Sequence, residues 1–105
     1  MAIEITNDNF EDIVKYNDVV LIDFWATWCG PCQMLAPVIK QLADDLDGKV
    51  VVGKCDVDEN EELAIKFGVN TIPNLVLIKD GTVIDRSVGY RDFNTLKTWV
   101  LNKIQ

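Results

Sequence analysis

Apolar residues change their spacing several times along the chain, and each change marks a new secondary-structure element. Residues 19–26 form an almost unbroken apolar run, rich in β-branched and aromatic side chains. Such a run is too short for a typical helix and indicates a strand that is buried on both faces. Residues 50–57 predict a second interior strand, and residues 3–5 predict a short strand near the start of the chain.

Between and after these strands, apolar residues recur at helical spacing in four segments. We expect residues 6–8 to supply the cap of the first helix, Pro31 to lie in the first turn of the second, and Asn60 to cap the third. The inward-facing positions are Phe10, Ile13 and Val14; Leu35, Val38, Ile39, Leu42, Ala43 and Leu46; Leu63, Ala64 and Phe67; and Phe93, Leu96, Val100 and Ile104.

Two further strands, residues 75–78 and residues 82–88, are joined at Lys79-Asp80-Gly81. An Asp-Gly pair between two apolar segments is a strong signal for a tight hairpin, so these two strands should be antiparallel. Strands that alternate with helices and then end in a hairpin predict an α/β fold, in which a mixed sheet carries helices on both faces.

Length and composition set limits on the organisation of the protein. With 105 residues, 49% of them hydrophobic, the chain predicts one domain over residues 1–105 with a single active surface. Its first residues lack a basic region followed by an apolar stretch, and no later apolar run is long enough to span a bilayer. We therefore expect a soluble, cytoplasmic protein.

The charge balance narrows the possible partners and chemistry. Lys and Arg number 10 against 17 Asp and Glu, and the net charge of −7 disfavours both nucleic acid and anionic membrane surfaces as partners. The sequence contains no histidine. This excludes nucleophile pairs that rely on His and all zinc sites that contain His.

The most informative motif is Cys29-Gly30-Pro31-Cys32, which lies where the strand of residues 19–26 gives way to a helix. The bare motif also fits a structural disulfide or half of a zinc site. One further cysteine, Cys55, leaves a closed zinc site short of ligands, and a bridge enclosing two residues would constrain little unfolded chain. Redox chemistry is favoured. Exposure and the positive end of the helix dipole would make Cys29 the attacking thiolate, which leaves Cys32 to resolve the mixed disulfide.

Asp23 places a charge inside an apolar strand. Either it is a solubilising charge on an exposed strand face, or it is buried, in which case desolvation raises its pKa and a partner must compensate the charge. The acidic run Asp56-Val57-Asp58-Glu59-Asn60 imitates the start of a calcium loop. It lacks the later Gly and Glu that such a loop needs, and we interpret it as a strand end followed by a helix cap.

The segment Trp25-Ala26-Thr27-Trp28-Cys29-Gly30-Pro31-Cys32 resembles the active-site signature of the thioredoxin family. The similarity extends over essentially the whole chain, since other family positions also occur in order and spacing: the Phe10 helix, Asp23, Pro37, Lys54, Thr71-Ile72-Pro73, Lys79-Asp80-Gly81 and Val88-Gly89. The resemblance implies a thioredoxin fold, with a central five-stranded mixed sheet flanked by four helices, and a cis peptide bond before Pro73.

The resemblance also implies a function: a protein-disulfide reductase that acts on disulfide-containing client proteins as a monomer, is recharged by thioredoxin reductase, and uses no cofactor or metal. In that role Asp23 takes the proton of Cys32, with Lys54 as its partner, and the backbone of Ile72 pairs with the client segment. The residues implied to form the docking surface are Trp28, Gly30, Pro31, Ile72, Pro73, Val88 and Gly89.

Several alternatives stay open at this point. A disulfide oxidase or isomerase of the same fold is disfavoured, because those relatives usually place His between the cysteines. A second role as a structural subunit is compatible with the sequence. Cys55 is interpreted as a small buried hydrophobic residue, with a regulatory thiol as the alternative. Asn74 and Tyr90 depart from the smaller residues usual at their positions in the family, which affects substrate preference.

Overall fold

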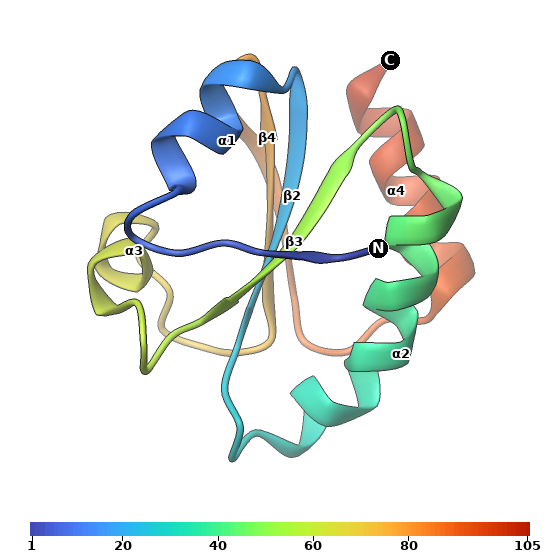
Figure 1. Cartoon of the computed structure of the whole chain (residues 1–105). Coiled ribbons are helices and arrows are strands. Elements are labelled where there is room, and N and C mark those ends of the chain that lie inside the picture. The colour runs from blue at the N-terminus through green and yellow to red at the C-terminus, as the bar shows by residue number, and fades with distance from the viewer.

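The computed structural model describes all residues from Met1 to Gln105 and contains a central sheet with helices on both sides (Figure 1). The strands are β1 (Ile3–Glu4), β2 (Val19–Trp25), β3 (Val51–Asp56), β4 (Asn74–Lys79) and β5 (Thr82–Val88). The helices are α1 (Phe10–Tyr16), α2 (Gly30–Asp45), α3 (Glu61–Lys66) and α4 (Phe93–Ile104). This arrangement confirms the five-stranded mixed sheet and four helices implied by the sequence.

The strand order across the sheet is β1-β3-β2-β4-β5. Strands β1, β3 and β2 run parallel, whereas β4 is antiparallel to both β2 and β5. The predicted hairpin joins β4 to β5. In its turn Asp80 and Gly81 have φ angles of 51° and 81°, values in the left-handed region that Asp and Gly tolerate better than most residues.

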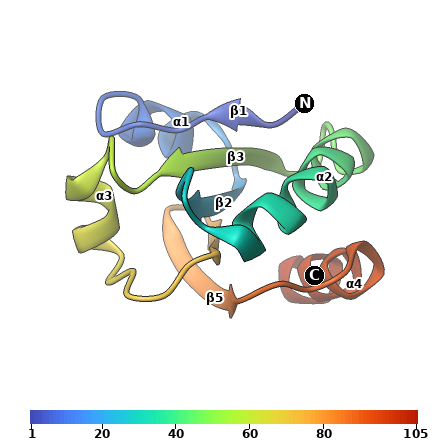
Figure 2. The ribbon, with the colours of Figure 1, turned by 90° about the horizontal axis from the view of Figure 1, so that it is seen from below.

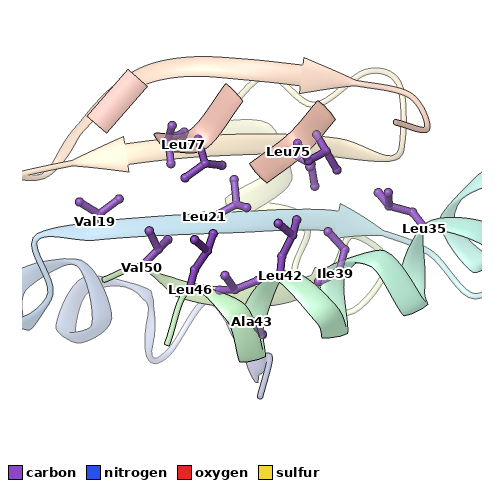
Figure 3. Close-up of a cluster of buried hydrophobic side chains, with 13 residues drawn as sticks. Val19, Leu21, Leu35, Ile39, Leu42, Ala43, Leu46, Val50, Leu75 and Leu77 are labelled. Atoms are coloured by element: carbon purple, nitrogen blue, oxygen red, sulfur yellow. The ribbon is translucent and has the colours of Figure 1, made fainter. Parts of the chain in front are cut away.

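The two faces of the sheet carry separate apolar clusters because side chains alternate along each strand. On one face, Val20, Ile22 and Phe24 of β2 pack with residues of α1 and α3. On the other face, Leu21 packs with residues of α2 and α4. Figures 1 and 2 show α1 and α3 on one side of the sheet and α2 and α4 on the other, and Figure 3 shows the leucine-rich layer between α2 and β2.

Two helix caps differ from the sequence prediction. Residues 6–8 do not cap α1, whose N-cap is Asn9. The segment folds into a turn in which the Thr6 N–H donates to Asn9 Oδ1 at 2.7 Å and the Asn9 N–H donates to Thr6 Oγ1 at 3.2 Å. Asn60 does precede α3, but its side chain forms no cap hydrogen bond, because it bonds instead to the backbones of Asn7 and Asp56.

No helix combines the length and the apolar character that crossing a bilayer requires. The longest, α2, starts at the carboxyl end of β2, so the Cys-Gly-Pro-Cys segment lies at the edge of the sheet where the parallel strands end. This topology determines where the site is built.

Candidate active site

Cys29 and Cys32 form a disulfide at the start of α2, with their Cα atoms 5.2 Å apart. Cys29 is the N-cap residue of this helix, and its Sγ accepts a hydrogen bond from the Cys32 N–H at 3.2 Å. Pro31 lies in the first turn, where its missing N–H costs no helical hydrogen bond. The predicted placement of Cys29 at the positive end of a helix is therefore confirmed.

Exposure does not distinguish the two cysteines, contrary to the sequence prediction. Cys29 is 5% exposed and Cys32 is 3% exposed. Both are covered because Ala26 packs against the disulfide together with Trp25, Val57 and Ile72. What distinguishes Cys29 is its position before the helix and its contact with the backbone of a second segment.

That second segment is the turn before β4. The peptide bond between Ile72 and Pro73 is cis, as the resemblance implied, and Cys29 Sγ lies 3.8 Å from the Ile72 carbonyl oxygen. The Gly89 N–H donates to the Pro73 carbonyl oxygen at 2.8 Å, which attaches the end of β5 to the same turn. The turn before β4 therefore contacts the dithiol, and the end of β5 is attached to that turn.

The seven residues predicted to form the docking surface differ in their exposure. Trp28 is 70% exposed and Val88 is 42% exposed. Gly30 and Pro31 are also exposed, Ile72 and Gly89 are half-buried, and Pro73 is buried. Pro73 thus shapes the turn beneath this surface, whereas Trp28 and Val88 present apolar area to solvent.

Asp23 is buried, with 1% of its surface exposed, and neither carboxylate oxygen has a hydrogen-bond partner. Asp23 lies two residues after Leu21 on β2, so both side chains are on the same face of the sheet, the one covered by α2, the helix that begins at the dithiol. Burial raises the pKa of Asp23 to about 7, and the attraction of Lys54 partly opposes this rise. The carboxyl group can therefore exchange a proton near neutral pH.

Lys54 is the direct neighbour of Asp23 across the parallel pair β2 and β3. The two side chains form no ion pair. Instead, Lys54 Nζ lies 4.5 Å from the centroid of the Trp25 ring, in a cation–π contact. This contact holds the lysine charge over the Trp25 ring, while Asp23 itself stays buried.

One residue of the site was missed by the sequence analysis. The Trp28 Nε1–H donates to Asp58 Oδ2 at 2.8 Å, and the Asp58 N–H donates to Asp56 Oδ1 at 2.9 Å. The acidic run after β3 therefore contains the anchor of the exposed Trp28 ring, where the sequence suggested only a strand end and a helix cap. The spacing of 30 residues between the partners gave no local signal.

Cys55 is fully buried on the face opposite Asp23, within the cluster beneath α1 and α3. Burial is the main cause that raises the pKa of its thiol to about 12, and nearby Asp56, Asp23 and Glu4 add to the rise. The thiol therefore stays protonated at neutral pH, which agrees with its interpretation as a small buried hydrophobic residue.

Comparisons with known proteins agree with this geometry. The family model described as Thioredoxin matches residues 1–102. A protein named Thioredoxin from Chlorobaculum thiosulfatiphilum is 51% identical over 87 residues, 82% of this chain and 81% of that protein. One from Staphylococcus saprophyticus is 51% identical over 89 residues, 85% of each chain. One from Rickettsia bellii is 44% identical over 105 residues, 99% of this chain and all of that protein.

Proposed function

Because this chain belongs to the thioredoxin family, we propose that it is a general protein-disulfide reductase, recharged by a thioredoxin reductase. Family membership and the Cys29–Cys32 disulfide make it a thioredoxin-type disulfide oxidoreductase. The direction of its reaction and the roles of single residues are the proposal. The observation that carries them is the position of Cys29 before α2, with its sulfur beside the Ile72 carbonyl.

In the proposed reaction the Cys29 thiolate attacks one sulfur of a client disulfide. A mixed disulfide forms between Cys29 and the client, and the other client sulfur leaves as a thiolate that takes a proton from solvent. The Cys32 thiolate then attacks Cys29 Sγ and releases the second client thiol. Two electrons pass to the client, and the protein is left with the Cys29–Cys32 bond that this structure contains.

Local structure supports this division of roles. The Cys32 N–H and the helix dipole both stabilise negative charge on the Cys29 sulfur. We assign Asp23 as the acceptor of the Cys32 proton, through water, because it lies on the α2 face with a pKa of about 7. Lys54 is assigned as the charge that limits the rise in this pKa.

Client binding is proposed to use the Ile72 backbone and the surface around it. An extended client segment would pair with this backbone by strand addition, so that main-chain hydrogen bonds supply affinity with little demand on sequence. Trp28, Pro31 and Val88 would supply apolar contacts; Gly30, Gly89 and the buried Pro73 would allow close approach.

The test is reduction of insulin with NADPH and the thioredoxin reductase of one of the bacterial relatives. Wild-type protein should support turnover, Cys29→Ser should abolish it, and Cys32→Ser should accumulate mixed disulfides that survive in a non-reducing gel. Cys55→Ser is the matched control, because its thiol is buried and should leave turnover unchanged. Two results would contradict the assigned roles. One is turnover by Cys29→Ser, and the other is that mixed disulfides accumulate with the wild-type protein but not with Cys32→Ser.

A further inference from the structure

A pocket adjoins the docking surface and shares Val88 with it. It has a volume of about 470 Å³ and is lined in part by Thr71 and Asn74, which flank the cis-proline turn, and by Arg86 and Val88 of β5. Thr71 is the residue before Ile72, whose carbonyl lies beside the Cys29 sulfur. A client segment paired with this turn would therefore pass the mouth of the pocket within a few residues of its own cysteine.

Asn74 gives this pocket an unused hydrogen-bonding group. Its side chain is 4% exposed, and its Oδ1 atom has no hydrogen-bond partner. Asn74 pairs with Val88 in the hairpin, and both lie on the face of the sheet that carries α3, as does Arg86 two positions before Val88. The NH₂ end of the same amide is not among the buried atoms without a partner, and it is the donor that a bound ligand group can reach.

Arg86 determines the charge that the pocket prefers. Its guanidinium forms no ion pair, and no acidic side chain lines the pocket. The protein as a whole carries a net charge of −7, so a guanidinium without an acidic partner gives this part of the surface a local positive charge. A guanidinium binds a carboxylate in two-pronged geometry, and the NH₂ group of the Asn74 amide can donate to the same carboxylate.

We propose that this pocket selects client disulfides with a Glu or Asp side chain within three residues of the attacked cysteine. Arg86 and Asn74 bind the carboxylate, and the client backbone pairs beside Ile72. The assignment deepens the proposed reductase function and rests on it. In this proposal Arg86 supplies the charge and Asn74 supplies the amide. Asn74 is then a residue that determines specificity.

The experiment uses disulfide-linked homodimers of one short single-cysteine peptide, with Glu, Gln or Lys placed two or three positions from the cysteine. Reduced wild-type protein should reduce the best Glu peptide about fivefold faster, in kcat/KM, than its Gln counterpart, the ratio expected of one partly exposed ion pair. The Lys peptide should be slowest. The ratio should decrease at high salt, because screening weakens the charge contact.

Variants separate the pocket from the rest of the docking surface. Arg86→Gln should bring the Glu to Gln ratio to about one, and Asn74→Ala should reduce it. Arg91→Gln is the matched control. Arg91 is an exposed cation after β5 whose guanidinium bonds to the Tyr90 carbonyl and which does not line the pocket. Arg91→Gln should keep the wild-type ratio.

The outcomes distinguish this inference from the reductase function. Equal rates for the Glu and Gln peptides with wild-type protein, or a preference that survives in Arg86→Gln, would overturn the pocket assignment and leave the reductase function intact. Faster reduction of the Gln peptide would overturn the carboxylate preference. If the wild-type protein reduces none of the peptides and also fails to reduce a small aromatic disulfide, the proposed function itself is contradicted.

Discussion

Replacing Asp23 by asparagine should make the oxidised protein more stable, and the gain should grow as the pH rises. The Asp23 side chain is 1% exposed and its two oxygens have no hydrogen-bond partner. An ionised carboxylate in that position is poorly solvated, whereas a neutral amide of nearly the same shape is not charged and fills the same space. The cost of the charge is therefore what the substitution removes.

The size of the effect follows from the pKa of Asp23, which burial raises from 3.8 to about 7. Between these values the folded protein holds a proton that the unfolded chain has released, so the free energy of unfolding decreases as the pH rises through this window. At pH 8, above both pKa values, the free energy of unfolding of the wild type is about 4 kcal/mol lower than it would be with an uncharged Asp23. At pH 5 the free energy of unfolding is lowered by about 2 kcal/mol.

Urea denaturation of the oxidised proteins, followed by circular dichroism at pH 5 and at pH 8, measures both values. Asp23→Asn should exceed the wild type by about 2 kcal/mol at pH 5 and by about 4 kcal/mol at pH 8. Asp47→Asn is the control, because Asp47 is exposed and water already solvates its charge. An equal gain at both pH values, or no gain at pH 8, would refute the reasoning.

Three further predictions concern the dithiol and its surroundings. In the reduced protein, limiting iodoacetamide should label Cys29 first by mass spectrometry and Cys55 last, since burial raises the Cys55 pKa to about 12; early labelling of Cys32 would reverse the assigned roles. Asp58→Ala should raise KM for insulin about two- to tenfold, because the Trp28 ring loses its 2.8 Å hydrogen bond, whereas an effect on kcat alone would argue against positioning by Asp58. Equilibration with a dithiothreitol buffer should give the Cys29–Cys32 disulfide a reduction potential of about −270 mV, the value typical of thioredoxins. The reason is that Gly30 and Pro31 carry no group that would stabilise the thiolate further. A potential of about −120 mV, typical of disulfide oxidases, would contradict the reductase assignment.

The elements of the fold could be predicted from the sequence because the strongest patterns are local. The apolar run of β2 and the Asp80-Gly81 turn of the hairpin carry their signals within a few residues. The order of the strands carries no such signal. A run of apolar side chains shows that both faces of a strand are covered, but which strands pair is decided by packing between segments far apart along the chain.

The site could be predicted only in part, for a similar reason. The dithiol and Asp23 break local patterns, one as a paired motif and the other as a charge in an apolar strand, and both were recognised. The Asp58 contact with Trp28 joins two segments 30 residues apart, and the pattern of neither segment indicates the other as its partner. The low exposure of Cys29 also depends on a distant segment, since Ile72 is among the residues that pack over it.

The buried polar atoms without partners are all found at one end of the sheet. They belong to Asp23 on β2 and Asn74 on β4. Because Asn74 pairs with the residue after Asp23, the two stand at neighbouring positions of adjacent strands, one facing α2 and the other facing α3. A buried polar group that lacks a partner costs about 1 to 3 kcal/mol, and an apolar residue would remove that cost at either position. Every other buried polar side-chain atom has a partner. The exceptions therefore lie at the end of the sheet where we propose that protons and client groups are exchanged, and stability is lost there.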